Sequence, residues 1–245
     1  MSITLAVQCQ YFERRLCWLM SSLLEQTCRD FIVSVAFVPK VGSPTCEDVL
    51  KFFRLKGVEV WPLVYHDQQR FQQRGYTRND QLRDCQTEWM WFADCDHVYN
   101  PEYVERLLAE LENRRDETKL ITAGRMSTTP GVDPFEFNAD YPVYHRDAFA
   151  RAKAVPNQKR RGSPGAGHTQ IVRVANLPDL IYVPEGKSRD HKWSEKGTKA
   201  KSDIQFRRKL GGSVKLPRWF QSNQIHLNHR RDSKDGEGQH LTEQR

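Results

Sequence analysis

The 245-residue chain has no apolar run that approaches the roughly 18 residues of a membrane-spanning helix. Its N-terminus, Met-Ser-Ile-Thr-Leu-Ala-Val, lacks the basic region and the small-residue cleavage site of a signal peptide. These absences argue against an integral membrane protein and against export. They predict a cytoplasmic protein, one that associates at most with the face of a membrane.

Two nucleotide-binding signatures are also missing. No Gly-x-Gly-x-x-Gly follows the first expected strand, and the chain contains no Gly-x-x-x-x-Gly-Lys-Ser/Thr. A dinucleotide site of the Rossmann type and a P-loop are therefore excluded. The six cysteines all lie in the first hundred residues and form no Cys-x-x-Cys pair. We expect reduced thiols rather than a zinc site or a disulfide framework.

Charge is distributed unevenly along the chain, although the net charge is only +7. Residues 1–145 hold 16 basic and 21 acidic side chains, whereas residues 146–231 hold 20 basic and 6 acidic ones. Such an excess of positive charge fits a polyanionic partner, namely a diphosphate, a nucleic acid or an anionic lipid surface. The alternative is a basic surface that serves solubility alone.

Short strands are expected to alternate with amphipathic helices over the first 125 residues. The expected strands are 3–8, 31–38, 58–64, 89–93 and 119–124. The expected helices are 13–26, 45–56, 77–85 and 101–114, with caps at Thr45 and Asn100 and a stop at Gly57. The polar stretch 66–75 is expected to stay outside the core. This alternation predicts an α/β fold with a single, mostly parallel sheet and helices on both faces.

The pattern becomes irregular after Gly124. Short strands are expected at 170–174 and 180–183, and a helix capped by Ser202 is expected to run to Leu210 and stop at two glycines. From about residue 230 the sequence has no hydrophobic pattern and is expected to be disordered.

Two carboxylates, Asp94 and Asp96, follow the expected strand 89–93. In open α/β sheets ligands bind beyond the carboxyl ends of the strands, and hard divalent cations prefer carboxylate oxygens. The alternative is a solvated turn, which is the commoner use of Asp-x-Asp on its own. The strand before the pair and the helix after it favour the metal site.

With its elements in this order, the chain resembles the family 2 glycosyltransferases, which have the nucleotide-sugar-binding GT-A fold. The matching segments are Arg78-Asn79, Phe92 to Asp96, Pro101 to Val104, Ser202 to Gly211 and Ile225 to His229. The chain departs from the family after its second strand, where Val38-Pro39-Lys40 contains no acidic residue for the nucleotide base. Base recognition is therefore expected to use other groups.

The resemblance implies a nucleotide-sugar donor, most often a UDP-sugar, and a bound Mn²⁺ or Mg²⁺. The implied metal ligands are Asp94, Asp96, His226 and His229; Asp94 would meet the donor ribose or a metal-bound water. Donor contacts are expected from Arg78, Asn79, Asp94, Gly167 and His168. Asp203 is the expected general base for an inverting transfer, with Asp190 and Glu185 as substitutes.

The leading hypothesis is a metal-dependent inverting glycosyltransferase that acts on a hydroxyl acceptor. The preferred candidate acceptor is a lipid-linked or cell-surface glycan. The second candidate is a modified base of DNA, as in phage enzymes. A non-catalytic nucleic-acid-binding protein remains the alternative, and nucleotidyl transfer is disfavoured because no glycine lies in residues 8–15. We assign 1–125 to the donor-binding half, 126–230 to the acceptor-binding half and 231–245 to the tail.

Overall fold

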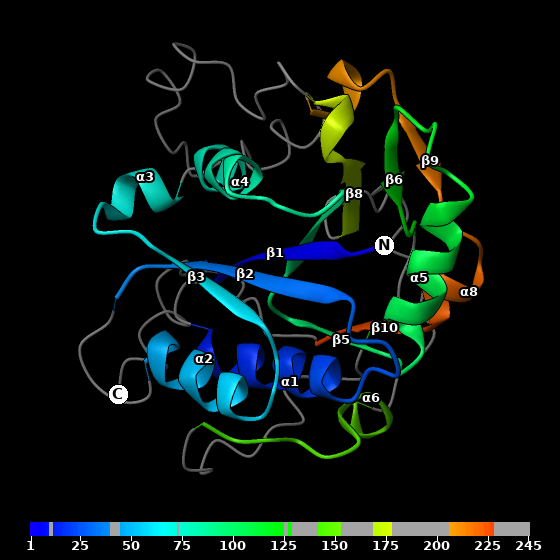
Figure 1. Cartoon of the computed structure of the whole chain (residues 1–245). Coiled ribbons are helices and arrows are strands. Elements are labelled where there is room, and N and C mark those ends of the chain that lie inside the picture. Colours follow the sequence, from blue (N-terminus) through cyan, green and yellow to red (C-terminus); the bar gives the residue numbers. More distant parts are fainter. Residues whose placement is uncertain are drawn as a thin grey trace, which may run out of the picture.

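A computed structural model describes residues 1–9, 12–39, 45–72, 74–124, 127–128, 142–152, 169–177 and 206–227. Within these residues, a seven-stranded sheet runs through the centre and carries helices on both faces (Figure 1). The α/β architecture with a mostly parallel sheet is therefore confirmed. The order of its strands decides where the polar residues at the strand ends meet.

The large sheet has the order β3-β2-β1-β4-β8-β6-β9. Its strands are β1 (Ile3–Cys9), β2 (Phe31–Phe37), β3 (Val60–Val64), β4 (Trp89–Asp94), β6 (Leu120–Thr122), β8 (Thr169–Arg173) and β9 (Ser213–Lys215). The first four strands are parallel, whereas β8 runs antiparallel to both β4 and β6. In the β1–β4 pair, Gln8 lies opposite Asp94. The carboxyl ends of these two strands therefore share one edge of the sheet.

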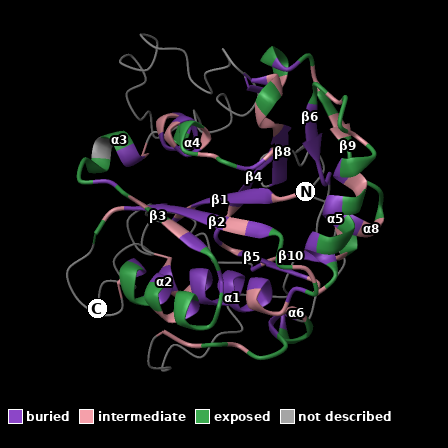
Figure 2. Cartoon of the chain, in the orientation of Figure 1, coloured by how far each residue is buried: buried purple, intermediate pink, exposed green. Residues whose placement is uncertain are grey.

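Helices α1 (Glu13–Leu24) and α2 (Cys46–Leu55) cover one face, and α3 (Gln68–Gln72) and α4 (Arg74–Arg83) cover the other (Figure 1). In Figure 2 the middle strands of the large sheet and the inward faces of the helices are mostly buried, whereas the edge strands β3 and β9 and the outward faces of the helices are partly or fully exposed. The predicted cap of α2 is confirmed, because the Thr45 hydroxyl accepts from Asp48 N and an Asp48 carboxylate oxygen accepts from Thr45 N. Gly57 follows this helix with a φ of 90°, a left-handed conformation that glycine adopts without strain.

Strand β4 separates two parts of the core. Trp89 and Trp91 belong to the cluster that includes α1 and α2, whereas Met90 and Phe92 pack with residues of α4, β8 and the segment after residue 205. Because side chains alternate along a strand, Asp94 continues the series of Met90 and Phe92. The carboxylate of Asp94 therefore belongs to the α4 face.

A second sheet, which the sequence did not predict, follows the two aspartates. It has the order β5-β10-β7, with β5 (His97–Tyr99), β7 (Ser127–Thr128) and β10 (Gln224–His226). Strand β5 pairs antiparallel with β10. The sequence analysis missed this small sheet, although it predicted the central, mostly parallel one. The physical reason is length: these strands have two or three residues each, too few to show an alternating pattern.

The expected start of the next helix is also wrong. Pro101 and Glu102 form a turn, and α5 (Tyr103–Glu112) begins after them. The Asn100 side chain nevertheless accepts a hydrogen bond from the Glu102 backbone N–H, at 3.0 Å. Asn100 therefore stabilises the turn before the helix rather than the helix itself.

The polar stretch 66–75 behaves differently from the expectation as well. It forms α3 and the start of α4, which begins three residues before the predicted Thr77. Phe71 is fully buried and packs against Tyr65 at a ring distance of 5.5 Å. Phe71 therefore packs this short helix on the core, although the other residues of the helix are polar.

The segment 142–152, which includes α6 (Ala148–Arg151), packs on α1. One carboxylate oxygen of Glu25 accepts from the Tyr144 hydroxyl and the Asp147 N–H, and the other accepts from the Ala148 N–H. The His145 ring stacks on Trp18 with 3.9 Å between centroids. This segment therefore closes a small core that it shares with α1, β5 and β10.

The remaining described elements lie near the end of the chain. They are the 3-10 helix Val174–Asn176, residues 206–209 in a helical conformation, and α8 (Trp219–Ser222). Gly211 and Gly212 follow the helical residues with φ values of 70° and 116°. The predicted strand 180–183, the Ser202 cap and the tail 231–245 lie outside the described residues.

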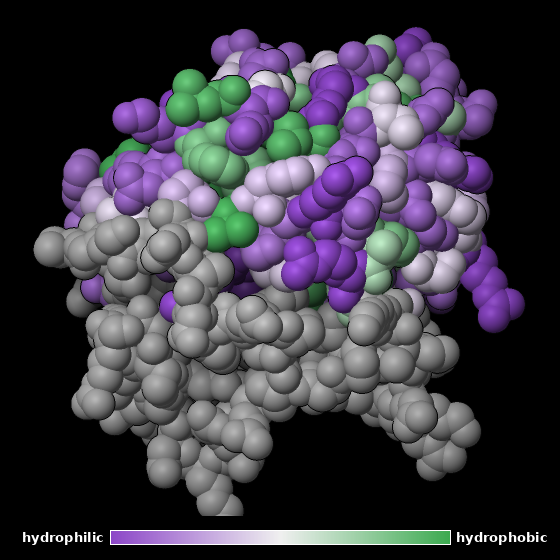
Figure 3. All heavy atoms as spheres, turned by 90° about the horizontal axis from the view of Figure 1, so that it is seen from below, coloured by the Kyte–Doolittle hydropathy of each residue, from purple (hydrophilic) through white to green (hydrophobic). Residues whose placement is uncertain are grey.

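The surface seen from the side of α1 and α2 is mostly hydrophilic where it is described, with scattered apolar residues (Figure 3). Among the described residues, no helix has the length and apolar character that a membrane span requires.

Candidate metal and donor site

The two aspartates lie at the point where the large sheet ends and the small sheet begins. Asp94 is the last residue of β4, Cys95 and Asp96 form a turn, and His97 opens β5. The Leu227 N–H donates to the Asp96 carbonyl at 2.8 Å, so the chain beyond β10 fastens the turn from the other side. A turn held in this way keeps its two carboxylates in place before any ligand binds.

The Asp96 carboxylate lies between two imidazoles. Its Oδ1 is 3.2 Å from Nδ1 of His97, and its Oδ2 is 3.2 Å from Nε2 of His226. The antiparallel register of β5 and β10 places these two histidines opposite each other, with ring centroids 5.5 Å apart. Each oxygen of Asp96 therefore has its own histidine.

This environment shifts the pKa values of the group. Burial on its own would raise the pKa of Asp96, but the contacts with His226 and His97 outweigh burial and hold the pKa well below its usual range. Burial would lower the pKa of His97, yet Asp96 and Asp94 together raise it. Asp96 is therefore an ionised carboxylate at neutral pH.

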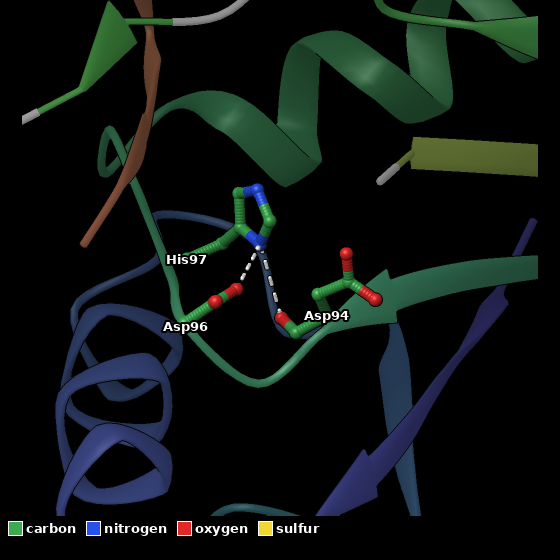
Figure 4. A group of neighbouring side chains, drawn as sticks. All are labelled: Asp94, Asp96 and His97. Carbon is green, nitrogen blue, oxygen red and sulfur yellow. Dashed lines mark hydrogen bonds and ion pairs between the residues drawn. The ribbon is translucent and has the colours of Figure 1, made fainter. Parts of the chain in front are cut away.

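Three side chains of the turn could hold a cation. One ligand atom each from Asp94, Asp96 and His97 lies within 4.8 Å of the others (Figure 4). Two carboxylates and an imidazole form a donor set that divalent cations such as Mn²⁺ accept. His97 Nδ1 is also 3.2 Å from the main-chain oxygen of Asp94. In the tautomer with a proton on Nδ1, the imidazole therefore orients the turn instead of binding the cation.

Two arginines of α4 occupy different environments beside this turn. Arg74 is half-exposed, and its Nη1 lies 3.6 Å from Oδ1 of Asp94. Arg78 is buried, donates from Nη1 to Gln170 Oε1 at 3.0 Å and lies 5.2 Å from the centroid of the Phe92 ring. Asn79, its neighbour, is also buried. Arg78 therefore links α4 to β8 in the structure as described.

The start of β8 is tied to the small sheet. The Thr169 hydroxyl donates to the Gln224 side chain at 2.9 Å, and the Tyr103 hydroxyl lies 3.3 Å from the same oxygen. Thr169, Gln170 and Gln224 are fully buried. The residues that follow His168 along the chain are therefore held next to the strand that carries His226.

The structure brings Asp94, Asp96 and His226 together and places Arg78 and Asn79 on the neighbouring helix. The other expected site residues, Gly167, His168, Asp203 and His229, lie outside the described residues, as do the substitutes Glu185 and Asp190. Sequence reasoning missed two side chains of the site, His97 and Arg74. His97 could have been found from its position directly after Asp96, whereas nothing in the sequence distinguishes Arg74 from the arginines around it.

Comparison with known protein families gives a match over residues 61–166 to the family described as Glycosyl transferase family 2. This segment contains all of β3 except Val60, together with α4 and the turn with both aspartates. Residues 61–166 therefore match a glycosyl transferase family 2 domain, in agreement with the resemblance. A comparison with curated proteins gives no match.

Solved structures with a similar fold include TarS of S. aureus, with 17% identity and a TM-score of 0.60 over 93% of this chain. TarS 1-349 in complex with UDP-GlcNAc has 16% identity and a TM-score of 0.62 over 94%. The mannosyltransferase PcManGT from Pyrobaculum calidifontis, in complex with GDP-Man and Mn²⁺, has 9% identity and a TM-score of 0.56 over 95%. The chain spans 37%, 59% and 58% of these three structures. At such identities the likeness shows the fold, which is GT-A-like.

Proposed function

We propose that the chain is a metal-dependent glycosyltransferase that moves a sugar from a nucleotide-sugar donor to a hydroxyl group. The observation that carries the proposal is the group of Asp94, Asp96 and His97 at the carboxyl end of β4. It lies inside the segment that matches the glycosyl transferase family. The C-terminal edge of a parallel sheet is also where ligands bind in folds of this kind.

The chemistry of the donor explains why this group is useful. When the bond between sugar and diphosphate breaks, negative charge develops on the diphosphate, and a bound Mn²⁺ or Mg²⁺ supplies the Lewis acid that neutralises it. Asp94 and Asp96 would hold the cation. His226 either completes the ligand set or keeps the Asp96 carboxylate oriented. An imidazole ligand favours Mn²⁺ over Mg²⁺, since imidazole is the softer donor.

A nucleoside diphosphate sugar is the proposed donor, with a UDP-sugar as the first choice. The similar structures include one in complex with UDP-GlcNAc and one in complex with GDP-Man. These two ligands share the diphosphate and differ in base and sugar. The family fold therefore supports the diphosphate donor more strongly than it supports any one base.

Asp203 is the proposed general base, which would take the proton of the acceptor hydroxyl during an inverting attack on the anomeric carbon. The support comes from the residues that follow it. Phe206 is fully buried, and its ring packs edge-on against Phe92 with 6.2 Å between centroids. Phe92 belongs to the same face of β4 as Asp94. The helical segment after Asp203 is thus anchored on the face that carries the proposed metal site.

The acceptor is proposed to be a glycan, and the charge distribution gives the second candidate. Residues 146–231 carry 20 basic and 6 acidic side chains, which would suit the phosphates of DNA as well as those of a lipid-linked glycan. Contacts with DNA phosphates make binding fall steeply with salt concentration. A titration of duplex-DNA binding with salt separates the two, because absent or salt-insensitive binding removes the DNA acceptor.

The deciding experiment is turnover of UDP- and GDP-sugars with and without Mn²⁺, for the wild type, Asp96→Asn and Asp203→Asn. Asp116→Asn is a matched control, because Asp116 is an exposed aspartate in the turn after α5. Metal-dependent turnover that both site variants lose and the control retains supports the proposal. Full activity in both site variants overturns the assignment of the site. If the wild type binds neither Mn²⁺ nor any nucleotide in calorimetry, the result supports the alternative, a non-catalytic protein that binds nucleic acid.

A further inference from the structure

We propose that Arg74 binds the diphosphate of the donor, after exchanging its ion pair with Asp94 for the phosphate oxygens. This inference rests on the proposed function and names a residue that the family resemblance did not indicate. It begins from the charge of the site. Two carboxylates and one divalent cation are together neutral, so the charge of an incoming diphosphate needs a further cationic partner.

Arg74 already lies at the right place for this role. Its guanidinium is 3.6 Å from the Asp94 carboxylate, which we assign to the metal site. Asp94 belongs to the α4 face of the sheet, and Arg74 is the first residue of α4. A phosphate group bound through a cation at Asp94 would therefore arrive within reach of the Arg74 side chain.

The backbone around Arg74 is held on both sides. The Phe71 carbonyl accepts a hydrogen bond from the Gln8 side chain at 2.5 Å and another from the Thr77 hydroxyl at 3.2 Å. Phe71 and Thr77 are fully buried, and Gln8 lies opposite Asp94 in the sheet register. The start of α4 is thus fastened to the same strand ends that carry the aspartates, which limits where the Arg74 side chain can reach.

The ion pair between Arg74 and Asp94 is easily broken. The pair is long, and the side chains are 49% and 28% exposed, so water screens the attraction. Before a ligand binds, Arg74 offsets the charge of Asp94 beside a second carboxylate. Once a cation binds Asp94, the guanidinium is released, and its planar fork can pair with two phosphate oxygens.

The other arginines of α3 and α4 have different partners. Arg78 is buried against Phe92 and donates to Gln170, so turning it toward a ligand would break contacts inside the protein. Arg70 pairs with Asp80 at 3.0 Å, and Arg83 pairs with the same carboxylate at 2.8 Å. Arg70 and Arg83 both line a pocket that the last residues of β3 also line. Arg74 is therefore the α4 arginine whose ion pair joins a carboxylate of the proposed site.

The test measures nucleotide binding by calorimetry in the presence of Mn²⁺ for Arg74→Ala, Arg74→Lys and the wild type. The probes are UDP and GDP, the monophosphates UMP and GMP, and the nucleosides. We expect Arg74→Ala to lose about tenfold or more in affinity for the preferred diphosphate, because a charge-assisted hydrogen bond is lost. Its affinity for the nucleoside should not change. Arg74→Lys should keep part of the affinity, since it keeps the charge and loses the fork.

Arg70→Ala is the matched control, because it removes an exposed ion pair from the same pair of helices, and it should bind diphosphates as the wild type does. In turnover, Arg74→Ala should raise KM for the donor more than it lowers kcat. If Arg74→Ala binds the diphosphate as tightly as the wild type while Asp96→Asn loses it, the inference about Arg74 is overturned and the proposed function stands. If the wild type binds no nucleoside diphosphate with Mn²⁺, both fail.

Discussion

Nε2 of His226 lies 3.2 Å from a carboxylate oxygen of Asp96, although His226 belongs to β10 and Asp96 to the turn before β5, far apart in the sequence. The contact exists because β10 pairs antiparallel with β5, directly after the turn that carries Asp96. His226 thereby joins the proposed metal site, which the first hundred residues begin. This relationship leads to the first two predictions.

Replacing His226 by glutamine should weaken Mn²⁺ binding by about 10- to 100-fold, which is the usual effect of removing a group that orients a metal-binding carboxylate. Calorimetric titration with Mn²⁺ measures the loss. His66→Gln is the control, because His66 is an exposed histidine beyond β3. Equal affinity in His226→Gln and the wild type would show that His226 contributes nothing to the metal site.

Adding Mn²⁺ should raise the Tm of the wild type, and removing it with a chelator should reverse the rise. The reason is mass action, since a ligand that binds only the native state adds about 2.7 kcal/mol at a concentration of one hundred times its Kd. Thermal-shift measurements on the wild type, Asp96→Asn and Asp116→Asn test this. An equal rise in the Tm of Asp96→Asn and of the wild type would show that Mn²⁺ binds elsewhere.

Replacing Asp48 by alanine should destabilise the protein by about 1 kcal/mol at neutral pH, because the N-terminal cap of α2 loses a carboxylate that accepts from Thr45. These hydrogen bonds lower the pKa of Asp48 in the folded protein, and the bond from the Thr45 backbone has the largest effect. Because the pKa of Asp48 is lower in the folded protein than in the unfolded chain, Asp48 stabilises the fold at pH values above its unfolded pKa. This stabilisation is lost as the pH falls through the folded pKa. The difference between variant and wild type should therefore shrink below about pH 4.

Urea unfolding at pH 7 and at pH 3 measures both effects. Glu47→Ala is the control, because Glu47 lies in the same first turn and is not a member of the capping box. A variant that unfolds like the wild type at pH 7 would contradict the role of the cap.

Acidification should destabilise the folded protein through the contact between His145 and Trp18. Burial, and then the charge of Arg151, lower the pKa of His145 to about 4. The unfolded chain therefore binds this proton at a higher pH than the folded protein, so stability is present above about pH 6.5 and is lost as the pH falls toward 4. The expected loss is on the order of 1 kcal/mol, because the partly exposed ring is screened by solvent.

Phenylalanine at position 145 keeps a ring to stack on Trp18 and cannot be protonated. In His145→Phe, the fall in stability between pH 6.5 and pH 4 should be smaller than in the wild type, as measured by denaturant unfolding at both pH values. An identical pH profile in the two proteins would assign the acid sensitivity to other groups.

The central part of the fold could be derived from local patterns. The expected strand at 89–93 is a run of apolar residues, and it becomes the buried strand β4 with Asp94 at its end. The cap at Thr45 was predictable because its hydrogen bonds are made within one turn of helix. In both cases the residues that decide the structure are neighbours in the sequence.

The small sheet and the contact between Asp96 and His226 could not be derived in this way. Strands of two or three residues have no period that can be recognised, and a pairing between β5 and β10 depends on how the intervening chain folds back. His97 follows Asp96 directly in the sequence, but its pairing with His226 in the other strand is visible only in the structure.

Local sequence alone was sufficient for the order of elements, the cap of α2 and the delivery of two carboxylates to the end of a buried strand, because hydrogen bonds and side-chain periodicity act over a few residues. Tertiary packing decided which side chains reach those carboxylates. Arg74 and Arg78 are one helical turn apart on α4, yet one pairs with Asp94 and the other with Gln170. The two arginines share a face of α4, so the difference follows from where each lies along the helix relative to β4 and β8, and only the packing of the whole domain sets that placement.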